Sequence, residues 1–352
     1  MKIYHYPLVT ILLFFSLSIF TQTIQLERKM PTVEQYGTTL ALGFAGGLNS
    51  PQFNEADLNN DGRNDLFLFD RVGNIAIAMR RKSDGTFALS QRLIQHFPDM
   101  EEWVLLRDYN GDGAMDIFTY NRDQASGIKV FRGFYGSDNL LNFERVSFDY
   151  LLDIIPVATP TGGVTQLYVS DIDYPSISDV DCDGDLDILT FNIGGGLIEY
   201  FQNQSIENGY GLDSLQYELA TNCYGGIYES GISESLSLSS SSGDCAEGFV
   251  GGDDTVEDRH VGSTLLSLDE DGDGDEDLIL GDLSFPNLNM STNAGSCGNA
   301  WMNEQDLNFP SYDLAVDLPI FPAAFYVDID GDNIRDLVAA PNPGNNGIDH
   351  EN

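Results

Sequence analysis

The sequence predicts an all-β protein, and three observations lead to this fold class. One acidic nine-residue loop occurs five times along the 352-residue chain. Each copy is followed by a short run of apolar, β-branched or aromatic residues, a pattern typical of a strand. The intervals between copies are long enough to hold two strand hairpins. Strand, acidic loop and strand therefore form the repeating unit.

The five loops share oxygen-bearing side chains at positions 1, 3, 5 and 9. These are Asp57, Asn59, Asp61 and Asp65; Asp108, Asn110, Asp112 and Asp116; Asp179, Asp181, Asp183 and Asp187; Asp269, Asp271, Asp273 and Asp277; and Asp328, Asp330, Asp332 and Asp336. Calcium takes roughly six to eight oxygen ligands, and a tight loop turns alternate carboxylates onto one ion. We therefore expect up to five structural Ca²⁺ ions.

Positions 6 and 7 fit the same interpretation. Position 6 must turn sharply, and it holds Gly in four loops and Asn333 in the fifth, both tolerant of positive φ. Position 7 is expected to offer its backbone carbonyl, which leaves its side chain free to vary. The residues at position 7 are Arg63, Ala114, Asp185, Asp275 and Ile334. If the loops bind metal, Asp273→Ala or Asp277→Ala should lower the melting temperature in calcium and change it little in chelator.

The residues after each loop exclude a helical EF-hand, which needs Glu at position 12 and flanking helices. Position 12 is Leu68, Thr119, Thr190, Leu280 or Ala339. None of these side chains supplies a bidentate carboxylate. The flanks are strand-like instead, for example residues 66–69 after the first loop and 103–106 before the second.

The spacing of the loops indicates a β-propeller. Successive loops begin 51, 71, 90 and 59 residues apart. Periods of about 40–50 residues with four strands per unit are typical of propeller blades, and insertions lengthen some of them. We expect about five four-stranded blades, starting near residues 50, 102, 174, 262 and 322.

The last blade is expected to be truncated and the ring incomplete, because only 24 residues follow Asp328. Residues 38–42 are a candidate strand to complete that blade from the N-terminal side. A fragment of a longer protein is the expected explanation.

With these features, residues 36–352 resemble the FG-GAP or VCBS repeat β-propellers, which include the head of integrin α-subunits. Blades of that family carry an Asp-x-Asp/Asn-x-Asp-Gly-x-x-Asp loop between their first two strands. Residues 42–70 are most similar to repeat proteins exported by bacteria with a type IX secretion system. The family includes adhesins, lectins and enzyme accessory domains, so the resemblance implies fold and metal rather than activity.

Charge and composition limit the classes of binding partner and the degree of disorder that we expect. The formal net charge of −40 repels nucleic acid and anionic membrane surfaces. Hydrophobic residues at 42% and aromatic residues at 11% nevertheless favour a packed core over disorder.

The N-terminus is typical of a secretory signal peptide over residues 1–22, leaving 23–352 as the propeller. Lys2 precedes an uncharged apolar run over residues 8–20, which is short for a membrane span. An uncleaved anchor is the alternative, and the cleavage point stays open. We expect a secreted or cell-surface protein that does not insert into a membrane once the signal is removed.

Four cysteines allow two disulfides in an exported chain, and three connectivities stay open. Cys223 and Cys245 bracket a Ser-rich insertion and are the preferred pair. Cys182 occupies position 4 of the third loop, where its side chain should point away from the ion, and its pairing with Cys297 is undecided.

The long intervals contain two insertions, residues 133–170 and 205–260, rich in Gly, Ser, Tyr and Asn. Such loops on a rigid scaffold often carry recognition, although variable linkers are an equal alternative.

Asp171 and Asp173 suggest a further metal half-site, but Pro175 interrupts the pattern and favours a turn cap.

The sequence contains no recognisable catalytic motif, neither His-Glu-x-x-His nor Gly-x-Ser-x-Gly nor a phosphate loop. We therefore expect a secreted calcium-binding propeller that acts as an extracellular binding or adhesion module for a protein or glycan. One alternative is the propeller of a calcium-dependent polysaccharide lyase, although 16 Lys and Arg residues are few for a basic groove. The other is a structural spacer in a larger surface protein.

Overall fold

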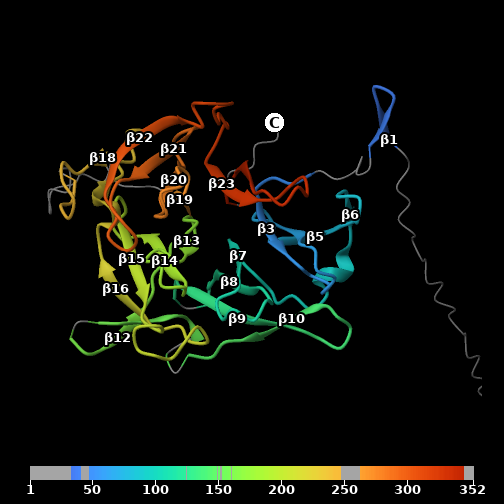
Figure 1. The fold of residues 1–352 in the computed structure, drawn as a ribbon, viewed down its shortest axis with the longest axis horizontal. Coiled ribbons are helices and arrows are strands. Elements are labelled where there is room, and N and C mark those ends of the chain that lie inside the picture. The colour runs from blue at the N-terminus through green and yellow to red at the C-terminus, as the bar shows by residue number, and fades with distance from the viewer. Residues whose placement is uncertain are drawn as a thin grey trace, which may run out of the picture. The chain divides into compact units, whose positions relative to one another are not determined.

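The computed structural model is almost entirely β (Figure 1). It describes residues 33–40, 47–123, 125–148, 150, 153–159, 161–246 and 262–344. The chain divides into two compact units, Met1–Phe44 and Ala45–Asn352. The predicted signal peptide lies outside the described residues. In the part of the chain that the structure describes, no helix is long and apolar enough to cross a membrane.

The described part of the first unit is a hairpin of β1 (Val33–Gln35) and β2 (Thr38–Leu40). Tyr36 and Gly37 form its turn with φ of 51° and 82°, which matches the two-residue turn favoured in hairpins. Of residues 38–42, predicted as a strand that completes the last blade, 38–40 form β2, and 41 and 42 lie outside the described residues. β2 pairs with β1, because this turn closes the hairpin locally.

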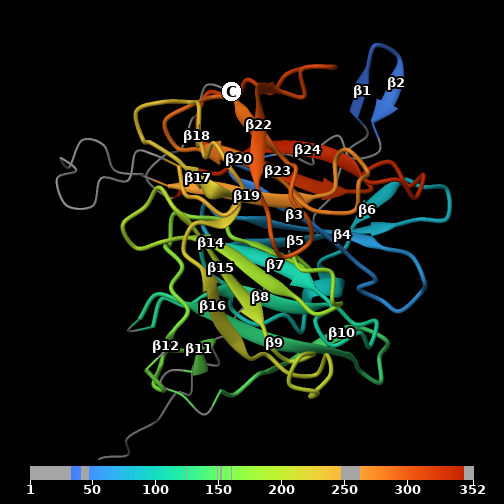
Figure 2. The same cartoon turned by 60° about the vertical axis from the view of Figure 1, so that its left-hand side comes forward.

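The second unit contains four antiparallel sheets arranged as propeller blades, which confirms the predicted fold class (Figures 1 and 2). Blade 1 is β3 (Pro51–Ala56), β4 (Asp65–Asp70), β5 (Ile75–Arg81) and β6 (Phe87–Leu89). Blade 2 is β7 (Val104–Arg107), β8 (Asp116–Tyr120), β9 (Ile128–Tyr135) and β10 (Leu141–Arg145). Blade 3 is β13 (Ser176–Ser178), β14 (Asp187–Phe191), β15 (Ile198–Asn203) and β16 (Tyr217–Thr221). Blade 4 is β19 (Ser263–Leu268), β20 (Asp277–Asp282), β21 (Leu288–Asn293) and β22 (Met302–Phe309).

The ring is not closed by a fifth complete blade. The last sheet has only two strands, β23 (Pro322–Val327) and β24 (Asp336–Pro341). β23 nevertheless packs against both β19 and β3. The Ser50 hydroxyl donates to the Pro343 carbonyl at 2.8 Å, so the first blade is also hydrogen-bonded to the residues after β24.

Both insertions form local structure. β11 (Pro156–Ala158) and β12 (Val164–Gln166) extend blade 3, with β11 parallel to β16. The short β17 (Ile227–Tyr228) and β18 (Ser237–Leu238) form a hairpin, and β18 contacts β22. Two 3₁₀ turns, η1 (Gln91–Ile94) and η3 (Tyr224–Gly226), complete the described elements.

The core lies between the blades. The second strand of each complete blade is buried along its whole length, because its two faces pack against different neighbours. This explains why these strands are continuous apolar runs rather than alternating ones. Aromatic residues link separate blades: the rings of Phe53 and Phe325 are 5.5 Å apart, and those of Trp103 and Tyr174 are 6.5 Å apart.

The cysteines form two disulfides, Cys223–Cys245 and Cys182–Cys297. The first confirms the preferred pair. The second settles the pairing that the sequence left open, and it joins the third loop in blade 3 to the turn after β21 in blade 4.

Candidate metal centres

Each predicted loop connects the first and second strands of one sheet. The first links β3 to β4, and the equivalent connections hold the other four. The structure therefore places all 25 predicted ligand residues in five equivalent hairpin turns.

In each loop, the carboxylate at position 1 accepts a hydrogen bond from a backbone N–H later in the same loop. In the first loop, Asp57 Oδ2 accepts a hydrogen bond from the Gly62 N–H at 2.7 Å. The same contact from position 6 to position 1 recurs as Gly113 to Asp108 (2.8 Å), Gly184 to Asp179 (3.0 Å), Gly274 to Asp269 (3.1 Å) and Asn333 to Asp328 (3.2 Å). The loops thus share one backbone conformation.

Position 6 is left-handed in every loop, as predicted, with φ from 68° at Asn333 to 101° at Gly184. Position 4 is left-handed as well, which sequence analysis missed. Its φ values are 54° at Asn60, 72° at Gly111, 64° at Cys182, 82° at Gly272 and 86° at Gly331. Asn or Gly at four of the five positions was the available signal. Cys182 is the exception, and the disulfide holds it there.

The carboxylate at position 9 ties the loop to the rest of its blade. Asp116 Oδ2 accepts the Tyr109 N–H at 2.9 Å, and Oδ1 accepts the Gly133 N–H of the third strand at 2.7 Å. The Oδ1 contact recurs as Arg81 to Asp65 (2.8 Å), Asn203 to Asp187 (2.8 Å) and Asn293 to Asp277 (2.7 Å). Position 9 is therefore a structural residue whether or not a cation is bound.

Three loops bring carboxylate oxygens within 4.8 Å of one another. The groups are Asp179, Asp181 and Asp187; Asp269, Asp271 and Asp273; and Asp328, Asp330 and Asp332. The first two loops have Asn at position 3, and their carboxylates form no such group among the described residues. In the first loop, Asn59 Nδ2 donates to Asp65 Oδ2 at 3.0 Å.

Glu207 is a candidate ligand that sequence analysis missed. Its carboxylate forms a further group with those of Asp181 and Asp183. It comes from the connection between β15 and β16, and Gln202 Nε2 donates to its Oε1 at 2.6 Å. Glu207 lies far from the third loop in sequence, so the repeated loop pattern does not include it.

Burial raises the pKa of the position-9 carboxyls in the four complete blades, Asp65, Asp116, Asp187 and Asp277. The pKa is about 6 for Asp65, about 7 for Asp116 and about 8 for Asp187, with loss of solvation as the largest cause in each. Neighbouring loop carboxylates raise these pKa values further. Burial makes the ionised form of these carboxyls unfavourable unless a nearby positive charge stabilises it. A divalent cation would supply that charge.

The donor set fits a hard cation. Asp185 and Asp275 at position 7 are 1% and 7% exposed, and the Oδ1 atom of each is buried without a hydrogen-bond partner. Asp183 Oδ2 is equally buried and unpartnered. Buried oxygens without partners are rare in native proteins, and an unplaced ion is one recognised explanation.

Two weaker candidates have structural roles. Asp173 Oδ1 accepts the Ser263 N–H at 3.0 Å, so it caps backbone between blades 3 and 4 rather than forming a metal half-site. His96 lies 3.0 Å from Asp138 at an exposed site. His260 and His350 lie outside the described residues.

Residues 57–119 match the family described as FG-GAP-like repeat. The match starts at position 1 of the first loop and ends in β8. Together with the arrangement of the sheets, it supports an FG-GAP β-propeller, the family that the loops resemble.

The chain was also compared with curated protein sequences and with solved structures. No curated protein sequence matches the chain. Among solved structures, the chain is similar to an Agrocybe aegerita lectin described as specifically recognising non-reducing terminal N-acetylglucosamine. The two chains share 17% identity with a TM-score of 0.40, over 83% of this chain and 74% of the lectin.

Proposed function

We propose that this chain is a secreted, calcium-stabilised FG-GAP β-propeller that serves as an extracellular binding module for a protein or glycan. The observation that carries the calcium proposal is the shared loop conformation, in which position 1 caps the turn and position 9 anchors it. The buried, unpartnered Oδ2 atom of Asp183 at position 5 supports it further.

In this proposal, calcium binds the side chains at positions 1, 3, 5 and 9 and the carbonyl at position 7. Glu207 adds a carboxylate at the third loop. Extracellular calcium modules have a Kd on the order of 10⁻⁴–10⁻³ M. At millimolar calcium, mass action then stabilises the fold by about 0.4–1.4 kcal/mol per site.

Secretion is supported by two disulfides, which persist in oxidising compartments. The predicted signal peptide points in the same direction. Binding rather than catalysis is proposed because the loops account for most paired carboxylates. Incubation with pectic and other acidic polysaccharides should give no unsaturated products, whereas their calcium-dependent release would favour the lyase alternative.

The test of the calcium proposal is titration calorimetry of the chain with calcium, followed by thermal melts in calcium and in chelator. We expect four or five ions per chain and a large fall in melting temperature when calcium is removed. Magnesium at the same concentration is the control, because its smaller octahedral shell suits these loops poorly. Binding of zero or one calcium ion would contradict the proposal.

A further inference from the structure

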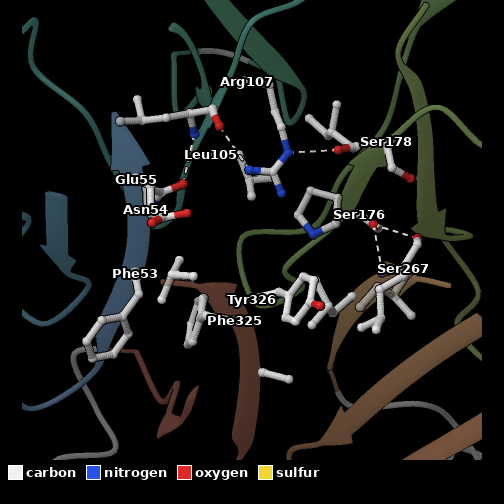
Figure 3. A pocket seen from close by; sticks show the side chains of 18 of the residues that line it. Phe53, Asn54, Glu55, Leu105, Arg107, Ser176, Ser178, Ser267, Phe325 and Tyr326 are labelled. Atoms are coloured by element: carbon white, nitrogen blue, oxygen red, sulfur yellow. Dashed lines mark hydrogen bonds between the residues drawn. The ribbon is translucent and has the colours of Figure 1, made fainter. Parts of the chain in front are cut away.

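The first strands of the five sheets surround a cavity of about 530 Å³ (Figure 3). Its wall includes residues from β3, β7, β13, β19 and β23, so the four blades and the last two-stranded sheet all contribute. This volume is in the usual range for small-molecule sites. None of the roles assigned above to the calcium loops uses the cavity.

One position of the repeated loop faces this cavity. The position-8 residues Met115, Leu186, Glu276 and Arg335 all line it. Position 8 differs in chemistry from loop to loop, although the next position, 9, is Asp in every loop. A variable position on an otherwise constant scaffold is where recognition is expected.

The polar groups of the cavity are held in place by hydrogen bonds. Arg107 donates from Nε to the Ile177 carbonyl and from Nη1 to the Leu106 carbonyl, each at 2.9 Å. The Ser178 hydroxyl donates to Glu276 Oε2 at 2.6 Å. These contacts fix one guanidinium and one carboxylate on the cavity wall before any ligand arrives.

Further hydroxyls and a second ion pair complete the polar lining. Ser267 and Ser176 are hydrogen-bonded to each other through their hydroxyls at 2.7 Å. Arg335 Nε lies 3.6 Å from Glu55 Oε2. The side chains labelled in Figure 3 come from β3, β7, β13, β19 and β23, strands of different sheets.

Aromatic rings supply an apolar wall. Phe325 packs edge-on against Tyr174 with ring centroids 5.6 Å apart, and both line the cavity. Tyr326, also on the wall, is 38% exposed. The exposed ring of Tyr326 beside fixed polar groups suits a ligand with an apolar face and a polar edge.

We propose that this cavity binds a neutral mono- or disaccharide, a proposal that rests on the binding function above and names its ligand class. The guanidiniums only donate hydrogen bonds, the carboxyl oxygens accept them and the serine hydroxyls do both. Sugar hydroxyls satisfy all three, and the C–H face of a sugar ring suits the aromatic wall.

Charge disfavours an ionic ligand. Arg107 and Arg335 share the wall with Glu55 and Glu276, so an anionic ligand would meet carboxyl groups beside the guanidiniums. Asp108 and Asp269 also line the cavity, but both are calcium ligands in the function proposed above. An anionic sugar would in addition approach a chain with a net charge of −40.

The experiment uses the whole chain in millimolar calcium and titration calorimetry with glucose, galactose, mannose, xylose, N-acetylglucosamine and their disaccharides. Glucuronate and galacturonate form the anionic arm. We expect at least one neutral sugar to bind, and Glu276→Gln and Tyr326→Ala each to weaken it about tenfold. Glu270→Gln and Tyr312→Ala are matched controls, because both residues lie outside the cavity lining and Tyr312 is 75% exposed, and they should leave binding unchanged.

The outcomes separate this proposal from the calcium proposal. If calcium binds and stabilises the chain but no neutral sugar binds, the saccharide proposal is wrong and the scaffold proposal stands. Binding that survives both cavity variants, or that is confined to the anionic sugars, also overturns it. A cavity variant counts only if its melting temperature in calcium is within a few degrees of the parent.

Discussion

At the scale of single residues, two carboxylates of the fourth loop have different structural roles. Asp273 at position 5 is exposed and accepts one hydrogen bond, from the Asp275 N–H at 3.1 Å. Asp277 at position 9 is 1% exposed and accepts N–H groups from both Glu270 and Asn293. The sequence pattern treats them alike as ligands, because it contains no information about the third strand.

We therefore expect Asp273→Ala and Asp277→Ala to differ in a way that the sequence did not predict. Asp273→Ala should lower the melting temperature in calcium and change it little in chelator, because its role is to bind metal. Asp277→Ala should lower it in both conditions, because two N–H groups lose their partner. Melts followed by circular dichroism make the comparison, and equal losses for Asp273→Ala in both conditions would show that the fourth loop binds no metal.

At the scale of elements, the position-9 anchor depends on the third strand of a blade. Four blades supply that strand, and its N–H reaches the Oδ1 atom of position 9. In the last sheet, Asp336 Oδ2 accepts the Ile329 N–H at 2.9 Å, but the described residues include no third strand beside β24. The same residue in the same loop therefore has fewer contacts.

Asp116→Ala should cost more stability than Asp336→Ala. The first change leaves two buried N–H groups without a partner, at about 1–3 kcal/mol each. The second removes one described contact at a half-buried site, so about 1 kcal/mol is expected. Urea unfolding in chelator removes any contribution from metal, and similar losses for the two variants would refute the anchoring role of position 9.

At the scale of the whole second unit, Arg71 connects the first blade to the last sheet. Its side chain is about 2% exposed, and it donates from Nη1 to the carbonyls of Ile172 and Asn342, each at 3.0 Å. It also donates to the Asp171 carbonyl and lies 3.5 Å from Glu102 Oε2. The Arg71 guanidinium thus contacts three segments that lie far apart in the sequence.

Arg71→Met should destabilise the chain by about 3–5 kcal/mol, because it leaves a buried carboxylate and several carbonyls without their partner. Arg122→Met is the matched control. Arg122 contacts the same Glu102 at 2.8 Å, but its side chain is 56% exposed, so a loss of at most about 1 kcal/mol is expected. Comparable losses in urea unfolding would show that Arg71 does not join the sheets.

The sequence by itself determined the all-β class, the blade repeat, the five acidic hairpins and the preferred Cys223–Cys245 pair. It did so because loop chemistry and strand periodicity are local, and one repeated pattern reports them five times. The tertiary structure decided the Cys182–Cys297 bond, the third-strand anchor of position 9, Glu207 beside the third loop, the Arg71 contacts and the cavity lined by position 8. Each of these joins residues distant in the chain, so no local pattern could predict them.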